Sequence, residues 1–294
     1  MILVTGGFGF QGAAVCETLV NKGFEVLSIS RKKRTSTLFE CGIAEVTDKE
    51  SLEKLFQQYP ITAVIHMVSL LATQSSNEPD QAVKVNVVGT LNLLELCRDR
   101  GIKKFVYGSS YNAVGYHPLA NCPIDETWEP RPDTFYGETK RFNEKLGISF
   151  ARLFGLEFVS ARMPILIGPG VPSETSAWRT DIFNLLKNGG EIDLRFAPDE
   201  TIPLAHISDT AEAIAAMCIA PQTNHQIYFT PSQSMLVSEI KSIVEKSGNH
   251  VDVKCGEKRL QDMPPLVNCS RVVDEFNLNP KTLEQHIKNY KQNK

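Results

Sequence analysis

TGGFGFQG at residues 5–12 and YGETK at residues 136–140 are the two stretches that decide the fold and the chemistry expected of this chain. The first follows an apolar run and leads into an amphipathic stretch, which is the pattern of a strand, a turn and a helix. Gly6, Gly9 and Gly12 permit a tight turn with close backbone approach, and a helix N-terminus attracts phosphate. We therefore expect the pyrophosphate of a dinucleotide at this turn.

Short β-branched runs alternate with amphipathic stretches along the chain. Strands joined through helices pair in parallel, so this alternation predicts an α/β fold with a doubly wound parallel Rossmann sheet. Capping patterns at residues 47–50 and 209–212 predict two further helices. The other predicted elements are strands at residues 2–5, 25–30, 63–67, 104–109, 158–163 and 226–229, and helices at 11–21, 80–100 and from 136 past 145.

The alternation changes after Pro164, because residues 168–180 are rich in Gly, Pro and Ser and cannot be regular throughout. A smaller lobe is expected to begin here and to cap the substrate. We expect an NAD(P)-binding Rossmann domain over residues 1–165, to which residues 203–230 return, and a C-terminal α/β substrate-binding lobe made of residues 166–202 and 231–294.

The chain has 294 residues, a formal charge of −3 and seven widely scattered cysteines. This charge gives no reason to expect binding to nucleic acid or to an acidic membrane. No stretch approaches the roughly 18–20 apolar residues of a membrane span. Without C-x-x-C pairs or a signal-peptide pattern, the sequence favours a reduced cytoplasmic protein with no metal and a small-molecule substrate.

The end of the second predicted strand distinguishes between two cofactors. Chains that bind NAD usually carry an acidic residue there for the ribose 2′-hydroxyl, whereas this chain has Ser30, Arg31 and Lys32. Arg31 can bind a 2′-phosphate and stack on adenine, so NADP is favoured over NAD. A solvated basic loop is the alternative. Glu45, after the third strand, is a candidate adenine contact.

Tyr136 and Lys140 are four residues apart and so share one face of a helix. The ammonium favours the phenolate, which suits a tyrosine that acts as acid and base. Ser110, at the end of a predicted strand, can hold the substrate oxygen by a hydrogen bond. Tyr290 and Lys294 repeat the spacing at the C-terminus, where no role is assigned. Position after the glycine turn and the serine strand, rather than spacing alone, therefore indicates catalysis.

These motifs, in this order, resemble the extended short-chain dehydrogenase/reductase family of the NAD-dependent epimerase/dehydratase type. AVIHMVS at residues 63–69, RMPILIGPG at 162–170 and HISDTAEAI at 206–214 extend the resemblance. It implies that Ser110, Tyr136 and Lys140 form the catalytic triad. Asn86 has an alternative role as a helix-interior asparagine bonded to backbone. The dinucleotide contacts that the resemblance and the glycine turn imply are Gly6, Gly9, Phe10, Gln11, Gly12, Met67, Val68, Ser69, Asn86, Lys140, Pro164 and Ile165.

Two departures from the family's nucleotide-sugar members concern the substrate. Many of those members carry an asparagine where this chain has Ile165, and often an arginine where this chain has residues 201–204. Without bidentate arginine or donor amides, a sugar diphosphate would be bound poorly. The R-x-P form at residues 162–164 is more similar to members that act on small hydroxy compounds, such as threonine or uronate dehydrogenases.

Candidate substrate contacts come from segments expected to border the cleft. Trp178 either closes over a ligand or anchors the core of the lobe. Arg179 and Arg195 are candidate carboxylate ligands, although an arginine is more often a surface residue. His206 is expected to stabilise the helix that follows it. The full set of candidate contacts is Tyr111, Asn112, His117, Trp178 and Arg179.

The leading hypothesis is an NAD(P)-dependent oxidoreductase. It would transfer a hydride between nicotinamide and a secondary alcohol or ketone of a small polar substrate, sugar-like or hydroxy-acid-like. A nucleotide-sugar epimerase or dehydratase with tightly bound NAD is one alternative, and a non-catalytic dinucleotide sensor is the other. The predicted helices 80–100 and 136–150 also suggest a homodimer contact, with burial against the sheet as the alternative, through Leu91, Leu94, Phe142 and Leu146.

Overall fold

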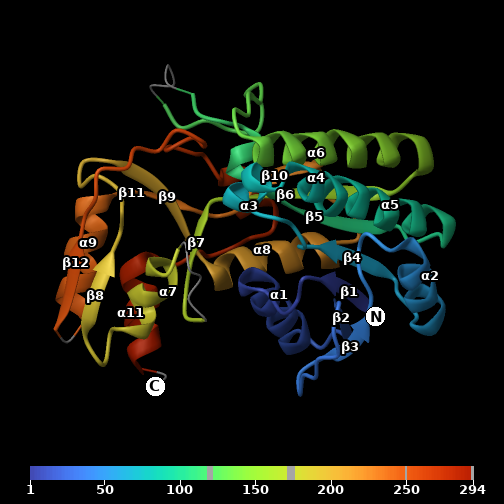
Figure 1. The fold of residues 1–294 in the computed structure, drawn as a ribbon, viewed down its shortest axis with the longest axis horizontal. Helices are drawn as coiled ribbons and strands as arrows, with labels where there is room; N and C mark the ends of the chain where they lie inside the picture. The colour runs from blue at the N-terminus through green and yellow to red at the C-terminus, as the bar shows by residue number, and fades with distance from the viewer. Residues whose placement is uncertain (118–121, 171–175, 249, 293–294) are drawn as a thin grey trace.

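The computed structural model describes residues 1–117, 122–170, 176–248 and 250–292. Its centre is a seven-stranded parallel sheet in the order β10-β6-β5-β4-β1-β2-β3, with helices on both faces (Figure 1). The predicted doubly wound fold is therefore confirmed. The strands are β1 (Ile2–Thr5), β2 (Val26–Ser30), β3 (Glu40–Ile43), β4 (Ala63–His66), β5 (Lys104–Ser110), β6 (Glu157–Met163) and β10 (Ile227–Phe229).

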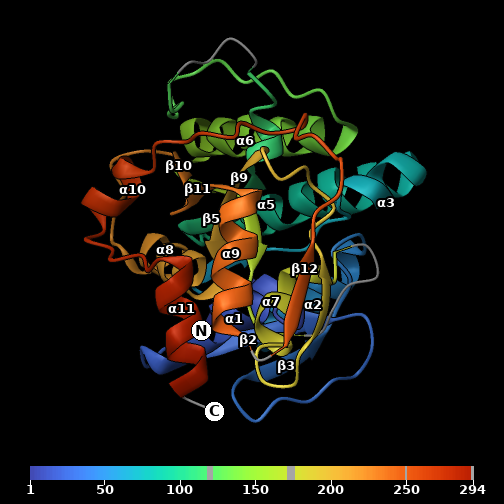
Figure 2. The same cartoon turned by 90° about the vertical axis from the view of Figure 1, so that its left-hand side faces the viewer.

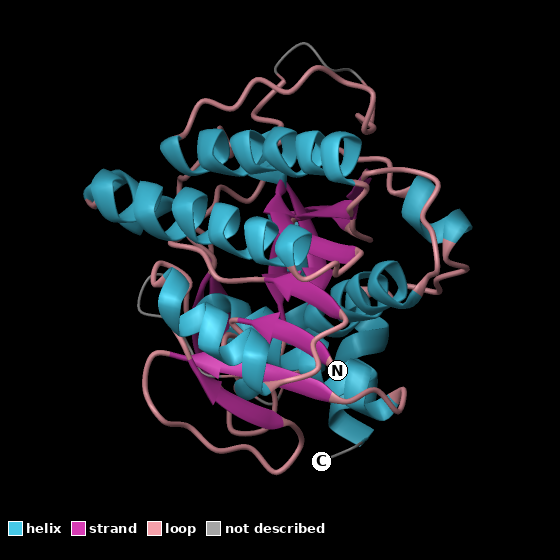
Figure 3. Ribbon diagram, turned by 90° about the vertical axis from the view of Figure 1, so that its right-hand side faces the viewer, coloured by secondary structure: helices cyan, strands magenta, loops and turns pink. Residues whose placement is uncertain are grey.

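Each face of the large sheet has its own apolar core. On one face, α1 (Phe10–Asn21) and α8 (Ile207–Ile219) pack against each other and against the sheet. On the other face lie α2 (Lys49–Gln58), α5 (Gly89–Asp99) and α6 (Phe135–Phe154). Figure 3 shows the two longest helical stretches side by side over this second face, with the strands behind them.

The C-terminal lobe carries two small sheets and a third core (Figures 1 and 2). Its strands are β7 (Ile165–Ile167), β8 (Gly190–Asp193), β9 (Thr201–His206), β11 (Gln233–Leu236) and β12 (Val251–Lys254), and its helices are α7 (Trp178–Asn184), α9 (Val237–Ser247) and α11 (Leu283–Gln292). The predicted return of the chain at residue 203 falls inside β9, which pairs with β7 and β11. The segment that packs on the large sheet begins instead with α8.

The predicted helix 80–100 is present as one continuous helical run over residues 79–99, whose centre is π-helical. Short helices α3 (Ala72–Asn77) and α4 (Pro79–Ala82) precede a π-helical segment, Val83–Val88, before α5 begins. The carbonyl of Asn86 accepts hydrogen bonds from the Thr90 hydroxyl at 2.5 Å and from the Asn143 amide at 2.7 Å. Side chains that enter the backbone ladder in this way favour the wider π-helical turn.

Two predicted helix caps are displaced by a few residues. The N-cap of α2 is Asp48, whose carboxylate accepts from the Ser51 amide at 3.2 Å, rather than Thr47. The N-cap of α8 is His206, whose Nδ1 accepts from the Ser208 amide at 3.2 Å. The predicted structural role of His206 is confirmed.

Some predictions fall outside the described residues, namely residues 171–175 of the Gly/Pro/Ser-rich segment and Lys294 of the repeated Tyr/Lys spacing. Within the described part of the chain, no helix combines the length and apolarity needed to cross a bilayer. The same residues contain no group of three or more His, Cys, Asp or Glu side chains arranged to hold a metal ion. Two short helical elements remain in this part of the chain, the 3-10 helix η2 (Tyr111–Ala113) after β5 and α10 (Ser270–Glu275) near the C-terminal end of the chain.

Candidate active site

The glycine turn follows β1, whose neighbours in the sheet are β2 on one side and β4 on the other. The turn therefore lies where the strand order reverses. Ligands of doubly wound sheets bind at this switch point, beyond the carboxyl ends of the strands. Gly6 has φ +77°, a left-handed conformation that favours glycine. A Cβ on Gly12 would lie 2.1 Å from the Gly6 carbonyl oxygen, so only glycine lets α1 approach the turn this closely.

The N-terminus of α1 suits a pyrophosphate. Its N-cap is Gly9, no described side chain caps it, and its first turn contains no acidic residue. The leading amide groups and the helix dipole therefore point toward an anion without competition from the protein's own carboxylates. The residues present fit a dinucleotide at this place.

Gln11 has a different role from the one expected. Its side chain is buried, and its Nε2 donates a hydrogen bond to the Ile207 carbonyl oxygen at 3.2 Å, which fastens α1 to the start of α8. The Nε2 group thus joins α1 to α8, while Oε1 of the same side chain is buried with no hydrogen-bond partner among the described residues. Phe10 lies against Gly170, at 3.2 Å from the Cβ position of that glycine.

The basic loop after β2 is exposed. Ser30 ends the strand and Arg31 follows it in solvent, with no carboxylate at the strand end. Arg34 lies 5.2 Å from the centre of the Phe8 ring, which brings a second cation back toward the glycine turn. Glu45 is exposed beyond β3, and its backbone amide donates a hydrogen bond to the Ser51 hydroxyl at 3.2 Å.

The loop after β4 abuts the glycine turn. A Cβ on Gly6 would lie 3.2 Å from backbone atoms of Met67 and Val68, so this loop and the turn border the same crevice. Asn86 holds the loop from behind: its Oδ1 accepts from the Leu70 amide at 2.7 Å and its Nδ2 donates to the Leu70 carbonyl at 3.1 Å. Asn86 is 1% exposed, so it supports the crevice rather than lining it.

The three predicted catalytic side chains come together at the carboxyl end of β5. Ser110 is the last residue of that strand, and Tyr136 and Lys140 lie in the first turns of α6. The ammonium of Lys140 donates a hydrogen bond to the Gly108 carbonyl at 2.7 Å and lies 5.4 Å from the centre of the Tyr136 ring. A phenol, an ammonium and a hydroxyl thus face one another across the gap between strand and helix.

Burial dominates the ionisation of this cluster. It raises the pKa of Tyr136 to about 12, while side-chain hydrogen bonds with Ser110 and Ser69 and the charge of Arg179 oppose the rise. Burial also lowers the pKa of Lys140 to about 7, and the Glu144 carboxylate opposes that fall. Both groups are thereby moved away from their ordinary values, as is usual where protons are exchanged.

Arg179, on α7 of the lobe, reaches toward the same cluster. Its charge acts on Tyr136, and burial lowers the pKa of its guanidinium while Tyr136 and Asp262 oppose that change. Its Nε is buried with no hydrogen-bond partner among the described residues. Asn112 is also at the cluster, because its Oδ1 accepts a hydrogen bond from the Ser110 hydroxyl at 2.9 Å.

Other candidate substrate contacts are core residues instead. Tyr111 is fully buried, and its hydroxyl donates to the Thr230 carbonyl at 3.1 Å. Trp178 is 5% exposed and packs edge-on against Phe196 in the core of the lobe, so it does not close over a ligand. The Ile165 side chain lies in the same core. These three side chains pack in the core of the lobe.

The remaining candidates lie in other surroundings. Arg195, at φ +62°, faces the Asp193 carboxylate at 3.9 Å on the exposed side of β8. His117 contacts Trp128 edge-on, with ring centres 5.5 Å apart. Pro164 is buried between β6 and β7, so its ring is part of the packing at the junction of the two domains.

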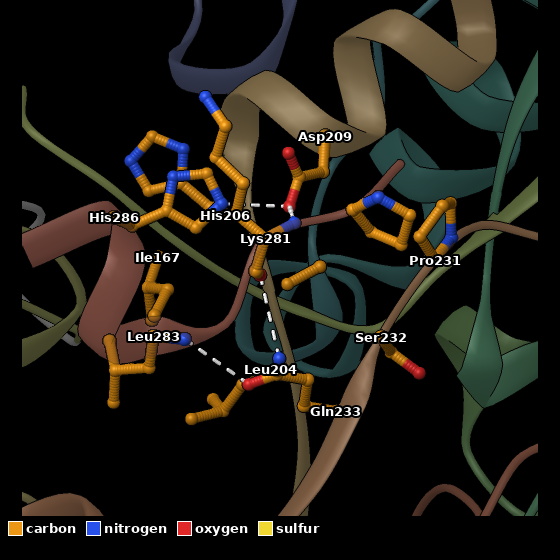
Figure 4. A pocket seen from close by; sticks show the side chains of 12 residues that line it. Ile167, Leu204, His206, Asp209, Pro231, Ser232, Gln233, Lys281, Leu283 and His286 are labelled. Carbon is orange, nitrogen blue, oxygen red and sulfur yellow. Dashed lines mark hydrogen bonds and ion pairs between the residues drawn. The ribbon is translucent and has the colours of Figure 1, made fainter. Parts of the chain in front are cut away.

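A small cavity of about 50 Å³ lies between α8, β9 and the C-terminal helix α11 (Figure 4). His206 and His286 stack beside it with ring centres 3.9 Å apart, and His286 Nε2 lies 2.8 Å from an Asp209 carboxylate oxygen. Ligand pockets usually measure about 300–1,000 Å³. This cavity is therefore a packing feature that joins α11 to α8, apart from the dinucleotide crevice.

Two charged residues that the motif analysis missed lie directly beneath the cluster. Glu144 and Arg162 form a bidentate ion pair and are 2% and 1% exposed. Glu144 follows Lys140 by four residues and Tyr136 by eight, so it lies on the same face of the helix. This spacing could have identified Glu144 from the sequence.

The chain belongs to the NAD-dependent epimerase/dehydratase family, whose model matches residues 2–228. It is therefore an NAD(P)-dependent enzyme of the extended short-chain dehydrogenase/reductase type. A putative UDP-glucose 4-epimerase of Methanocaldococcus jannaschii is 31% identical over 222 residues, which are 72% of each chain.

Relatives with a different activity have a similar level of sequence identity to this chain. The mitochondrial L-threonine 3-dehydrogenase of Bos taurus is 27% identical over 230 residues, which are 75% of this chain and 60% of that protein. Among solved structures, L-threonine dehydrogenase from Cupriavidus necator superposes with a TM-score of 0.89 at 20% identity over 99% of both chains. At this identity the superposition shows the fold and does not choose between the activities.

Proposed function

We propose that this enzyme is an NADP-linked dehydrogenase or reductase of a small polar substrate that carries a secondary alcohol or ketone, sugar-like or hydroxy-acid-like. The observation that carries the proposal is the meeting of Ser110, Tyr136 and Lys140 at the end of β5, next to the glycine turn. A panel of small hydroxy acids, polyols and keto acids, assayed for NADP(H) absorbance change, tests it. Net cofactor turnover with at least one of them is expected.

Different residues would bind the cofactor, orient the substrate and transfer the proton. The glycine turn and Arg31 would hold the dinucleotide, and Lys140 would bind its nicotinamide ribose. When bound, the dinucleotide supplies or accepts the hydride. Ser110 orients the substrate oxygen by a hydrogen bond, and Tyr136 gives or takes the proton on that oxygen. The Lys140 ammonium, 5.4 Å from the centre of the tyrosine ring, favours the phenolate.

Two residues expected to lie near the substrate, Ile165 and Arg179, favour a small substrate that carries a carboxylate. Ile165 stands where many nucleotide-sugar members have asparagine, and its side chain is 3% exposed within the lobe core, so it offers no donor. The Arg179 guanidinium, by contrast, lies near Tyr136 with an unpartnered buried nitrogen among the described residues. A carboxylate on the substrate would supply that partner.

Replacing Arg179 by glutamine is expected to lower kcat/KM for hydroxy-acid substrates by about ten- to a hundredfold, since a charge-assisted hydrogen bond contributes about 1.5–3 kcal/mol. Steady-state kinetics measures the change. A substrate of similar size without a carboxylate serves as the control and should lose much less. Equal losses with both substrates would contradict the assignment of Arg179.

The cofactor preference rests on the end of β2, where Ser30 and the exposed Arg31 occupy the place of an acidic residue. Replacing Arg31 by alanine is expected to raise the Kd of NADPH about tenfold or more, through loss of a charge-assisted contact with the 2′-phosphate. Fluorescence titration measures it. NADH, which lacks this phosphate, is the matched control. Wild-type protein that binds NADH more tightly than NADPH would contradict the preference.

A nucleotide-sugar epimerase or dehydratase is the second candidate, favoured by the 31% identity with a putative UDP-glucose 4-epimerase. Such an enzyme regenerates its cofactor in every cycle. Purified protein that retains NAD through dialysis, binds UDP- or dTDP-sugars and shows no net cofactor turnover would support it. The non-catalytic sensor is disfavoured, because a sensor has no need of the Ser110/Tyr136/Lys140 arrangement.

A homodimer through α5 and α6 remains part of the proposal, with Leu94 removed from its predicted contacts and Leu153 and Phe154 added. Leu91 and Leu146 are half-buried and pack partly against the core below them. Leu94 is fully buried in the core beneath α5, so it cannot serve as a contact. On α6, Phe142, Leu153 and Phe154 are 53%, 64% and 43% exposed. Sedimentation at micromolar concentration is expected to give twice the 32.7 kDa chain mass, and Phe142→Glu should restore the monomer. A wild-type monomer would contradict it.

A further inference from the structure

Glu144 is a charged residue that the proposed mechanism leaves unexplained. It follows Tyr136 and Lys140 at intervals of four residues, so all three lie along one face of α6. All three are buried, at 7%, 2% and 2% exposure for Tyr136, Lys140 and Glu144. A carboxylate in such a place is costly unless hydrogen bonds and counter-charges compensate it.

Four donors surround the Glu144 carboxylate. Oε1 accepts hydrogen bonds from the Ser109 hydroxyl at 2.7 Å, the Ser160 hydroxyl at 2.9 Å and Arg162 Nε at 2.9 Å. Oε2 accepts from Arg162 Nη2 at 2.8 Å. Donors at both oxygens fix the Glu144 carboxylate in one orientation.

These donors belong to the strands that build the active site. Ser109 directly precedes Ser110 on β5, while Ser160 and Arg162 lie on the neighbouring β6. One turn earlier on α6, Lys140 donates to the Gly108 carbonyl of β5 at 2.7 Å. The helix that carries Tyr136 is therefore attached to the strand that carries Ser110 at two successive points.

The charges also alternate in a chain behind the lysine. Lys140 is followed by Glu144, then by Arg162, whose charge acts on Glu126, and Glu126 in turn lies 3.3 Å from Arg271. Each member therefore has a neighbour of opposite sign, in a chain of three cations and two anions that runs from the site outward.

The other titratable groups around Lys140 are neutral near pH 7. His66 on β4 has its pKa lowered to about 3 by burial and by Lys140. Tyr107 on β5, whose ring centre is 4.8 Å from the Lys140 ammonium, has its pKa raised by burial, as does Tyr136 on α6. Among the described residues, Glu144 is thus the anion that acts on this ammonium.

We propose that Glu144, held by Arg162, is a positioning residue of the active site: it supplies the counter-charge of Lys140 and attaches α6 to the strand that carries Ser110. The inference rests on the proposed function of the Ser110/Tyr136/Lys140 cluster. It adds a residue that touches neither substrate nor cofactor and acts through the lysine.

The test follows the titration of Lys140 directly. Protein labelled with ¹³C at lysine Cε is titrated by NMR, and the Lys140 signal is assigned by its loss in Lys140→Met. In Glu144→Gln the midpoint is expected to fall by about one pH unit or more relative to wild type, because an opposite charge nearby favours the charged form. A purely structural role for Glu144 predicts an unchanged midpoint in the folded variant, and that result would overturn the proposal.

Glu157→Gln is the matched control. Glu157 pairs with Lys104 at the opposite ends of the same two strands, and its loss should leave the Lys140 midpoint in place. If Glu144→Gln does not fold because Arg162 is left unpaired, the double variant Glu144→Gln/Arg162→Met removes both charges. Its Lys140 midpoint is expected to fall in the same direction but by less, because a nearby cation is lost together with the anion. A wild-type midpoint in a folded double variant would equally overturn the proposal.

The titration needs no substrate, so its failure is distinct from failure of the proposed function. Turnover that survives Tyr136→Phe would reject the function while the Lys140 shift stands. An unshifted Lys140 together with loss of turnover in Tyr136→Phe would reject only the role of Glu144.

Discussion

Replacing Tyr136 by phenylalanine is expected to lower kcat by about a hundredfold or more, because a positioned acid/base contributes about 10²–10⁴-fold to such reactions. The phenol is 7% exposed, so phenylalanine preserves the ring packing and removes only the hydroxyl group that exchanges the proton. Steady-state measurement with the best substrate of the carbonyl and hydroxy panel gives the loss. Binding of NADPH, followed by fluorescence, should change little.

The chain supplies a control for this substitution. Tyr290 also has a lysine four residues later, but it lies on α11, where its ring packs edge-on against Phe183 at 5.7 Å between centres. Tyr290→Phe keeps that packing and is expected to retain nearly all activity. Wild-type turnover in Tyr136→Phe would remove the catalytic assignment, and equal losses in both variants would point to packing instead of chemistry.

Replacing Arg162 by methionine is expected to lower the free energy of unfolding by about 3–5 kcal/mol, because the substitution leaves a buried carboxylate without its counter-charge. Arg162 is 1% exposed, and it supplies two of the four hydrogen bonds to Glu144. Urea denaturation followed by circular dichroism measures the loss. The double variant Glu144→Gln/Arg162→Met should recover most of it, since neither charge then remains.

Arg98 provides the comparison on the surface. It pairs with Asp99 at 2.7 Å at the end of α5, where the two side chains are 35% and 47% exposed. Exposed pairs of this kind contribute about 0–1 kcal/mol. Arg98→Met is therefore expected to cost about 1 kcal/mol at most, and a similar loss for both arginines would contradict the importance given to burial.

Local sequence patterns predicted those structural features that are set by residues close together in the chain. The glycine spacing places the turn between β1 and α1, and the four-residue interval places Tyr136 and Lys140 on one helix face. Both depend on backbone geometry that repeats within a few residues. The alternation also predicted the parallel sheet, whose carboxyl-end edge is where such folds bind ligands, whereas the order of the strands came from the structure.

Residues whose roles depend on distant partners were harder to assign. Tyr111 was expected to touch substrate, but the Thr230 carbonyl, 119 residues away, accepts its hydrogen bond in the core. Trp178 had two possible roles until packing against Phe196 decided for the core. Gln11 was expected at the cofactor, yet its amide bonds to Ile207, 196 residues later. No pattern of short range carries this information.

By itself the sequence determined the parallel sheet, the dinucleotide turn and the three residues proposed for catalysis, because each follows from periodicity or spacing along one or two adjacent elements. Only the tertiary structure decided which side chains face the cleft and which charges meet. Glu144 and Arg162 are eighteen residues apart on a helix and a strand, and they become partners when α6 packs on β6. Burial and pairing of charge arise from that packing, and they set the pKa of Lys140.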